Sequence, residues 1–165
     1  MKNLVLCVLV SFLTLILLAG CGSAKDQETT AFSGEDIVVD MQAFLKRIED
    51  AELFADTLER ARESVLSAVM YLTTDGIETS AIHMGSGFTG EAFGAFKCVS
   101  ADAAGLLTDE LDEYVKAQKA MYADYAPDAI PRLNNAIIRR SGSYVAYVVA
   151  ERHIDALKIV EEYFK

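Results

Sequence analysis

Cysteine, histidine, proline and tryptophan are scarce in this sequence of 165 residues, which contains three, two, two and none of them respectively. Three cysteines cannot build the disulfide framework of a small secreted scaffold, so the apolar core has to stabilise the fold. With only two histidines, a zinc site would need carboxylate ligands, and the sequence does not indicate which carboxylates would serve. We therefore expect no metal and no bound cofactor.

Positive charge is scarce as well. The sequence has 15 Lys and Arg residues against 25 Asp and Glu residues, for a formal net charge of −10. A surface of this sign repels phosphate backbones and the anionic headgroups of a bilayer. We therefore expect neither a nucleic acid partner nor anchoring through a basic patch.

The N-terminal segment carries the most specific pattern in the sequence. Met1–Asn3 has one positive charge, and Leu4–Leu18 is an apolar run of about fifteen residues, shorter than the ~20 that a spanning helix needs. Leu18-Ala19-Gly20-Cys21 then has the form of a bacterial lipobox. We expect cleavage between Gly20 and Cys21 and diacylation of the Cys21 sulfur. The alternatives are an ordinary secretory signal and a short membrane helix.

Processing at Cys21 would divide the chain into three parts. Residues 1–20 form the signal peptide, residues 21–34 the lipidated cysteine with a flexible tether, and residues 35–165 a single domain. The tether is polar and non-periodic and spans roughly 20 Å. Because the signal peptide takes one cysteine and acylation another, Cys98 is the only free thiol left. The mature chain is expected on the extracytoplasmic face of the cell membrane, held by its diacylglyceryl group.

Two helical segments are expected at the start of the domain. Ser33 stands before two acidic residues, which is typical of a helix start, and apolar residues follow at three- and four-residue spacing as far as Ile48. A second stretch with this spacing runs from Leu58 to Leu72 and ends at the turn residues 73–76.

The pattern then changes to that of strands. Residues 77–84 and 91–99 lie on either side of a glycine-rich loop, which predicts a β-hairpin. A second hairpin is expected from residues 136–141 and 143–150. Residues 144–149 are apolar on both faces, with alternate side chains pointing opposite ways, so this strand should be central in the sheet.

One long helix is expected between the hairpins, capped by Ser100 and ended by Ala126-Pro127. Its predicted buried stripe is Leu107, Leu111, Tyr114, Gln118, Met121 and Tyr125. Its acidic residues lie away from this stripe and are expected to face solvent; they are Asp109, Glu110, Asp112 and Glu113. Pro131 should keep the residues after the helix irregular.

A last helix should bury Ile154, Leu157, Val160 and Phe164. The expected order of elements is therefore α-α-ββ-α-ββ-α. This order predicts an α+β domain, in which helices pack on an antiparallel sheet of two β-hairpins.

Several turns and helix ends resemble those of a known family. The residues that carry the resemblance are Gln118, Tyr122, Tyr125-Ala126-Pro127, Pro131-Arg132-Leu133, Ser141-Gly142-Ser143-Tyr144-Val145 and Ala95-Phe96-Lys97. They are similar to those of bacterial lipoproteins, mostly from Firmicutes, catalogued as domain of unknown function 4358, over roughly residues 35–165. Thr57–Leu72 departs from that pattern, because it looks longer and more helical. The resemblance implies an envelope lipoprotein and supplies no catalytic residues.

The glycine-rich loop matches a nucleotide-binding motif by its letters alone. Residues 85–90 read G-x-G-x-x-G, but phosphate binding by this motif needs a helix directly after it. Because residues 91–99 are expected to form a strand, we predict a hairpin turn and no nucleotide. Phe88 stands at the tip of the turn, where it either contacts a partner or folds back over the sheet edge.

His83 and Cys98 do not form a thiol–imidazole pair in the predicted register. Antiparallel pairing sets His83 opposite about Ala92 and Cys98 opposite about Ile77. The two residues are then some six residues apart along the strands, or roughly 20 Å. Cys98 is instead expected to be a small buried residue.

The remaining polar residues form no specific catalytic pattern. Asp124 and Asp128 flank a proline turn, where they serve as caps or form an acid/base pair. Arg132, Arg139 and Arg140 are candidates for a small anion site. Adjacent strand residues face opposite ways, however, so Arg139 and Arg140 do not both contribute.

The leading functional hypothesis is a non-enzymatic, lipid-anchored lipoprotein of the cell envelope. Its domain would bind another envelope component, a protein, because the sequence has an anchor and a tether but no converging polar cluster. Two alternatives stay open. One is an envelope hydrolase that uses carboxylates such as Asp124 and Asp128, and the other is a small-solute binder with an enclosed apolar pocket.

Overall fold

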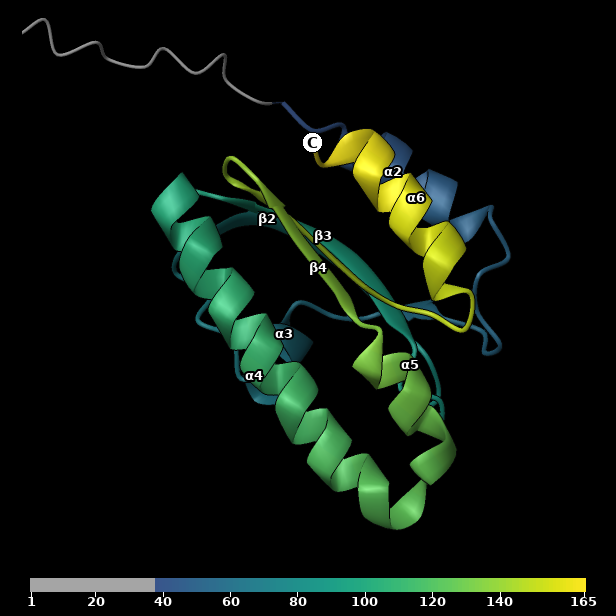
Figure 1. The fold of residues 1–165 in the computed structure, drawn as a ribbon. Helices are drawn as coiled ribbons and strands as arrows, with labels where there is room; N and C mark the ends of the chain where they lie inside the picture. Colours follow the sequence, from purple (N-terminus) through teal and green to yellow (C-terminus); the bar gives the residue numbers. More distant parts are fainter. Residues whose placement is uncertain (1–37) are drawn as a thin grey trace, which may run out of the picture. The chain divides into compact units, whose positions relative to one another are not determined.

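The computed structural model of the chain describes residues 38–165. The predicted signal peptide (1–20), the lipidation site at Cys21 and the tether (21–34) lie outside the described residues. No helix among the described residues is both long enough and apolar enough to cross a membrane. The elements drawn in Figure 1 are, in order, α2 (Met41–Glu49), β1 (Glu59–Arg60), α3 (Ser64–Ala68), β2 (Ile77–Met84), β3 (Ala92–Cys98), α4 (Ala101–Tyr125), the 3₁₀ helix η2 (Pro127–Ala129), α5 (Ile130–Asn134), β4 (Ile137–Ser141), β5 (Tyr144–Val149) and α6 (His153–Tyr163).

One antiparallel sheet of five strands lies at the centre, in the order β1-β2-β3-β5-β4. The two predicted hairpins, β2–β3 and β4–β5, are both present, and they join through β3 and β5, where Ala95 pairs with Ala146. The α+β prediction is thus confirmed. The two-hairpin description is incomplete, because the short strand β1 adds to the edge of β2.

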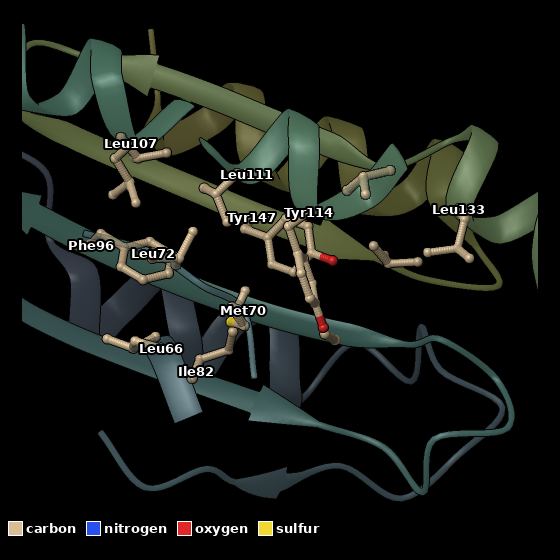
Figure 2. Packing of buried hydrophobic residues seen from close by; sticks show 14 of the residues in the cluster. Leu66, Met70, Leu72, Ile82, Phe96, Leu107, Leu111, Tyr114, Leu133 and Tyr147 are labelled. Carbon is tan, nitrogen blue, oxygen red and sulfur yellow. The ribbon is translucent and has the colours of Figure 1, made fainter. Parts of the chain in front are cut away.

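Helices cover both faces of the sheet (Figure 1), with α4 on one face and α2 and α6 on the other. In β5, residues 145, 147 and 149 pack on the α4 side and residues 144, 146 and 148 on the α2–α6 side, so the predicted alternation is confirmed. Figure 2 shows Leu107, Leu111 and Tyr114 of α4 pointing towards Phe96 and Tyr147 of the sheet.

Helix α2 begins later than predicted. Residues 38–40 are not helical, so the prediction of one continuous helix from Ser33 is wrong. The N-cap is Asp40, whose carboxylate accepts a hydrogen bond from the Ala43 backbone N–H at 2.9 Å. Asp40 supplies an acceptor for a first-turn N–H that has no partner within the helix, which is why the helix begins there.

The predicted helix over residues 58–72 is largely wrong. Residues 59–60 form β1, and only residues 64–68 form helix α3. The Ala61 N–H donates to the Ile82 carbonyl at 2.9 Å, so this stretch extends the edge of the sheet. Pairing with the edge of β2 outweighs the helical propensity of a segment rich in Leu, Glu and Arg.

Helix α4 begins and ends where predicted. Ser100 caps it by accepting the Ala103 N–H at 3.1 Å, and Tyr125 is its last residue. The prediction that Pro131 keeps the following residues irregular is wrong, because α5 spans residues 130–134. A proline is tolerated in the first turn of a helix, where its missing N–H would have no partner.

The buried stripe of α4 follows the prediction only in part. It holds as far as Tyr114 and then continues at Tyr122, which leaves Met121 and Tyr125 half exposed. A period of 3.6 residues carries the buried face from Leu111 to residue 122 after three turns, rather than to residue 121.

Helix α6 also buries a somewhat different face from the predicted one. Val160 and Phe164 are buried, but Ile154 and Leu157 are exposed. The ring of Phe164 packs edge-on against Phe44 of α2, with the ring centroids 5.0 Å apart. This contact sets the orientation of α6 and turns Ile154 and Leu157 to solvent.

Candidate functional site

An open groove runs between α4 and the chain that follows α3. Its volume is about 760 Å³. On one side it is lined by the end of α3 and the next three residues, and on the other by one face of α4. The lining residues are Ala68, Val69, Met70, Tyr71, Asp109, Glu110, Glu113, Tyr114, Ala117, Gln118 and Met121.

Large apolar side chains in this groove are open to solvent. Tyr71 is 83% exposed, Met121 49% and Val69 47%. An exposed apolar patch that is bordered by polar residues and lies beside a hollow is typical of an interaction site. We call this surface, made of the eleven lining residues, the α4 groove.

The backbone at Tyr71 is strained. Its φ is 57°, in the left-handed region that favours glycine. The neighbouring amides hold it there, because the Met70 N–H donates to the Val65 carbonyl at 3.0 Å and the Leu72 N–H to the Leu66 carbonyl at 2.9 Å. A non-glycine residue in this conformation costs on the order of 1–2 kcal/mol. The side chain that is held in this strained conformation, the Tyr71 ring, projects into solvent.

Three carboxylates border the α4 groove. Glu110 Oε2 accepts the Thr73 backbone N–H at 2.8 Å, and Glu113 lies 2.6 Å from Lys116 in an exposed ion pair. Asp109 and Glu110 also line a second hollow of about 240 Å³ further towards the start of α4. Asp109, Asp112 and Glu113 are exposed, as predicted, and only Glu110 is half-buried. The prediction did not include the apolar surface that Asp109, Glu110 and Glu113 border.

Sequence reasoning missed most of this site. Val69 and Tyr71 lie in a stretch that the sequence predicts to be helical, and the spacing of Met121 predicts that it belongs to the buried stripe of α4. One available signal was the run Val69-Met70-Tyr71-Leu72, since one face of a helix cannot bury four consecutive apolar residues.

The glycine-rich loop is the predicted hairpin connection between β2 and β3, and a strand follows it. Asp56 Oδ2 accepts hydrogen bonds from Ser86 N at 2.7 Å and from Ser86 Oγ at 2.6 Å, and these bonds lower the pKa of Asp56. The Tyr125 hydroxyl donates to the Gly87 carbonyl at 3.1 Å. The loop is therefore attached to the end of α4.

Phe88 lies at the tip of this loop and is 71% exposed. The alternative in which Phe88 folds back over the sheet edge is therefore wrong. Whether Phe88 contacts a partner stays a prediction.

Glu91 forms a buried polar clamp at the start of β3. Its carboxylate accepts the Ala55 N–H at 3.0 Å, the Asp56 N–H at 2.9 Å and the Glu151 N–H at 2.9 Å. Arg132 Nε lies 3.7 Å from Glu91 Oε1 and 2.5 Å from Glu151 Oε2, although neither contact is aligned as a hydrogen bond. Glu91 thus joins three segments that are distant in sequence.

His83 and Cys98 are kept apart, as predicted. Cys98 pairs with Ile77, whereas His83 pairs with Phe93 rather than Ala92, a difference of one residue. The His83 ring stacks on Phe93 with centroids 4.5 Å apart, and burial lowers its pKa. Cys98 is buried as predicted, and burial raises the pKa of its thiol.

The other predicted residues do not converge. Asp124 and Asp128 are exposed, and neither lines the α4 groove. Arg139 lies 3.4 Å from Glu161, and Arg140 donates to the Ala101 carbonyl at 3.0 Å, so each has its own neighbour. No cluster of three or more His, Cys, Asp and Glu side chains suited to a metal occurs within residues 38–165.

A comparison with known families bears directly on this region. Residues 56–150 match the model of a domain of unknown function, DUF4358. The chain belongs to this family. The DUF4358 match contains every residue of the α4 groove and leaves α2 and α6 outside, so it is shorter at both ends than the predicted extent. Neither the curated proteins nor the solved structures contain a match to the chain.

Proposed function

We propose that this member of the DUF4358 family is a lipid-anchored binding module of the bacterial envelope, without enzymatic activity, and that the α4 groove is its binding surface. The observation that carries the proposal is Tyr71, an exposed aromatic residue held in a left-handed backbone conformation beside an open apolar groove. Backbone strain of this kind persists where the surrounding structure holds it, and it is concentrated at functional sites.

The chemistry of the groove favours binding over catalysis. Its titratable side chains are three carboxylates and two tyrosines, Tyr71 and Tyr114. Burial raises the pKa of Tyr114 to about 12, so the Tyr114 hydroxyl keeps its proton at neutral pH. The groove is an open channel on the surface, which does not exclude water as catalytic sites commonly do. Its apolar lining is what a partner's side chains would cover.

Site-specific photo-crosslinking in cells tests the proposal. Tyr71 is replaced by a photoreactive phenylalanine derivative in the full-length protein, and Ile154 of α6, also exposed, serves as the control position. We expect a discrete protein adduct from position 71 and none from position 154. Equal yields from both positions, or adducts with lipid only, would contradict the proposed surface. The same probe at Phe88 tests whether the loop tip belongs to it.

The anchor is tested separately. In the proposed topology, peptide 1–20 is removed after Gly20, Cys21 carries the diacylglyceryl group, and residues 21–34 tether the domain 35–165. A Cys21→Ala variant should keep its signal peptide and lack the lipid, as judged by mass spectrometry of the N-terminus. A free Cys21 thiol in the wild-type protein would overturn this part of the proposal.

A small-solute binder is the second candidate, since the groove volume of about 760 Å³ falls in the range of ligand pockets. Native mass spectrometry of the purified protein distinguishes the two. A stoichiometric small molecule that is lost in the Met121→Ala variant would favour the solute.

A further inference from the structure

The α4 groove and the second hollow together follow most of the length of α4. The hollow is lined by Ala103 and Leu106 near the start of the helix, and the groove extends to Met121. At a rise of 1.5 Å per residue, the fifteen steps from Leu106 to Met121 span about 22 Å, or roughly four helical turns. Leu106 at one end and Met121 at the other are both exposed.

The charge between these apolar ends is of one sign. Asp109, Glu110 and Glu113 lie there, and no Lys or Arg is among the described residues that line either hollow. Lys116 pairs with Glu113, but both side chains are well exposed, and such a pair contributes little. One carboxylate oxygen of Glu110 accepts the Thr73 N–H. A bound segment would therefore meet a net negative charge beside an apolar floor.

From this arrangement we infer that the occupant of the α4 groove is a cationic amphipathic helix of a protein partner, an inference that rests on the proposed function. Apolar side chains at i, i+3 or i+4, and i+7 would enter the groove, and Lys or Arg on the flank would face the three carboxylates. The net charge of −10 would speed the approach of such a segment. An anionic bilayer surface is disfavoured, because the same carboxylates repel it.

Binding of synthetic peptides to the full-length protein in detergent tests the charge. Two fluorescent peptides of about 18 residues share one apolar face, and their polar faces carry either Lys and Arg or Glu. By fluorescence anisotropy, the cationic peptide should bind at least about tenfold more tightly. A third peptide, cationic with a central proline, should lose binding if the bound form is helical. Equal affinity for the proline peptide would overturn the helical form.

Matched variants separate a local site from general attraction. The double variant D109N/E113Q should weaken binding of the cationic peptide by about tenfold, whereas D112N/D124N removes the same charge from α4 outside the groove and should leave it nearly unchanged. The Met121→Ala variant should also weaken binding without lowering the unfolding midpoint. Equal losses from both double variants would overturn the inference, because the attraction would then be non-specific.

The outcomes also separate this inference from the proposed function. If the acidic peptide binds as well as the cationic one, the charge preference is wrong and the groove remains a binding surface. If no peptide binds but position 71 still crosslinks to a protein, the inferred partner is wrong and the proposed function stands. If both experiments fail, both conclusions are overturned.

Discussion

The two faces of the sheet are covered in different ways. On one face α2 and α6 pack together, and Phe44 contacts both Phe164 and Tyr163, with ring centroids 5.0 and 5.7 Å apart. On the other face α4 is accompanied by the five-residue helix α3 and the chain after it, which leave the α4 groove open. Two full helices close a core, whereas one helix and a short segment leave apolar side chains exposed.

The family match follows the same division. It contains α4 and all the residues of the groove, and it does not reach α2 or α6. The matched residues therefore span the sheet and the open face. On the α2–α6 face, the strand residues lie inside the match and the two helices lie outside it.

The largest expected effect is on the closed face. Phe44→Ala should lower the free energy of unfolding by about 3–5 kcal/mol, because it leaves a cavity among fully buried rings. Tyr71→Ala on the open face should lower it by less than about 1 kcal/mol. Urea denaturation of both variants measures the difference. Similar losses would mean that the groove belongs to the core.

Glu91→Gln should have the next largest effect, about 2–4 kcal/mol, because an amide NH₂ would then face backbone N–H donors in a buried position. Glu151→Gln is the matched control, since its side chain is half exposed and should cost less than about 1 kcal/mol. Thermal unfolding of both variants measures the loss of stability. Hydrogen exchange of the backbone amides on the two faces of the sheet then shows whether Glu91 couples the stability of one face to that of the other. If the two variants lost the same stability, Glu91 would not be the clamp.

Substitution by glycine usually lowers the free energy of unfolding, but Tyr71→Gly should not. Glycine relieves the positive φ, so the free energy of unfolding should stay unchanged or rise by up to about 1 kcal/mol, while binding to the cationic peptide falls. Chemical denaturation and anisotropy are measured on the same preparation. A clear loss of stability would show that the ring supports the fold and is not there for binding.

The smallest expected effect is the pH dependence contributed by His83. Burial, as the main cause, and Arg60, as a minor one, lower the pKa of His83, and Glu49 opposes them. Its neutral form is thus favoured in the folded state, so this stability is complete above about pH 6.5 and is lost as the pH falls through the folded-state pKa. The His83→Leu variant should lose less stability than the wild type between pH 6.5 and 5. Parallel curves for the two proteins would contradict this.

Elements defined by local signals were predictable from the sequence. The β2 strand, the Ser100 cap and the alternation along β5 each follow from a pattern within a few residues, and the structure confirms them. The stretch 58–72 failed because its helical composition competes with the edge of β2, which is brought near only by the folded sheet.

The candidate site was less predictable for the same reason. Met121 has the spacing of a core residue, and its exposure depends on how far the chain after α3 extends over α4. The positive φ of Tyr71 is likewise invisible in a sequence that shows neither glycine nor asparagine there. Both features come from tertiary packing.

Strand β5 carries apolar side chains on both faces, so a slip of one residue would exchange two nearly equivalent hydrophobic surfaces. In a half-buried strand, the penalty for burying polar groups prevents such a shift of register. In β5 the adjoining turn fixes the register instead. In this turn Ser141 pairs with Tyr144 across only Gly142 and Ser143, and Gly142 has a φ of 57°. Four consecutive residues thus set the register of the strand that both cores share. Because this turn is local in sequence, the hairpin can form within microseconds, before either core assembles.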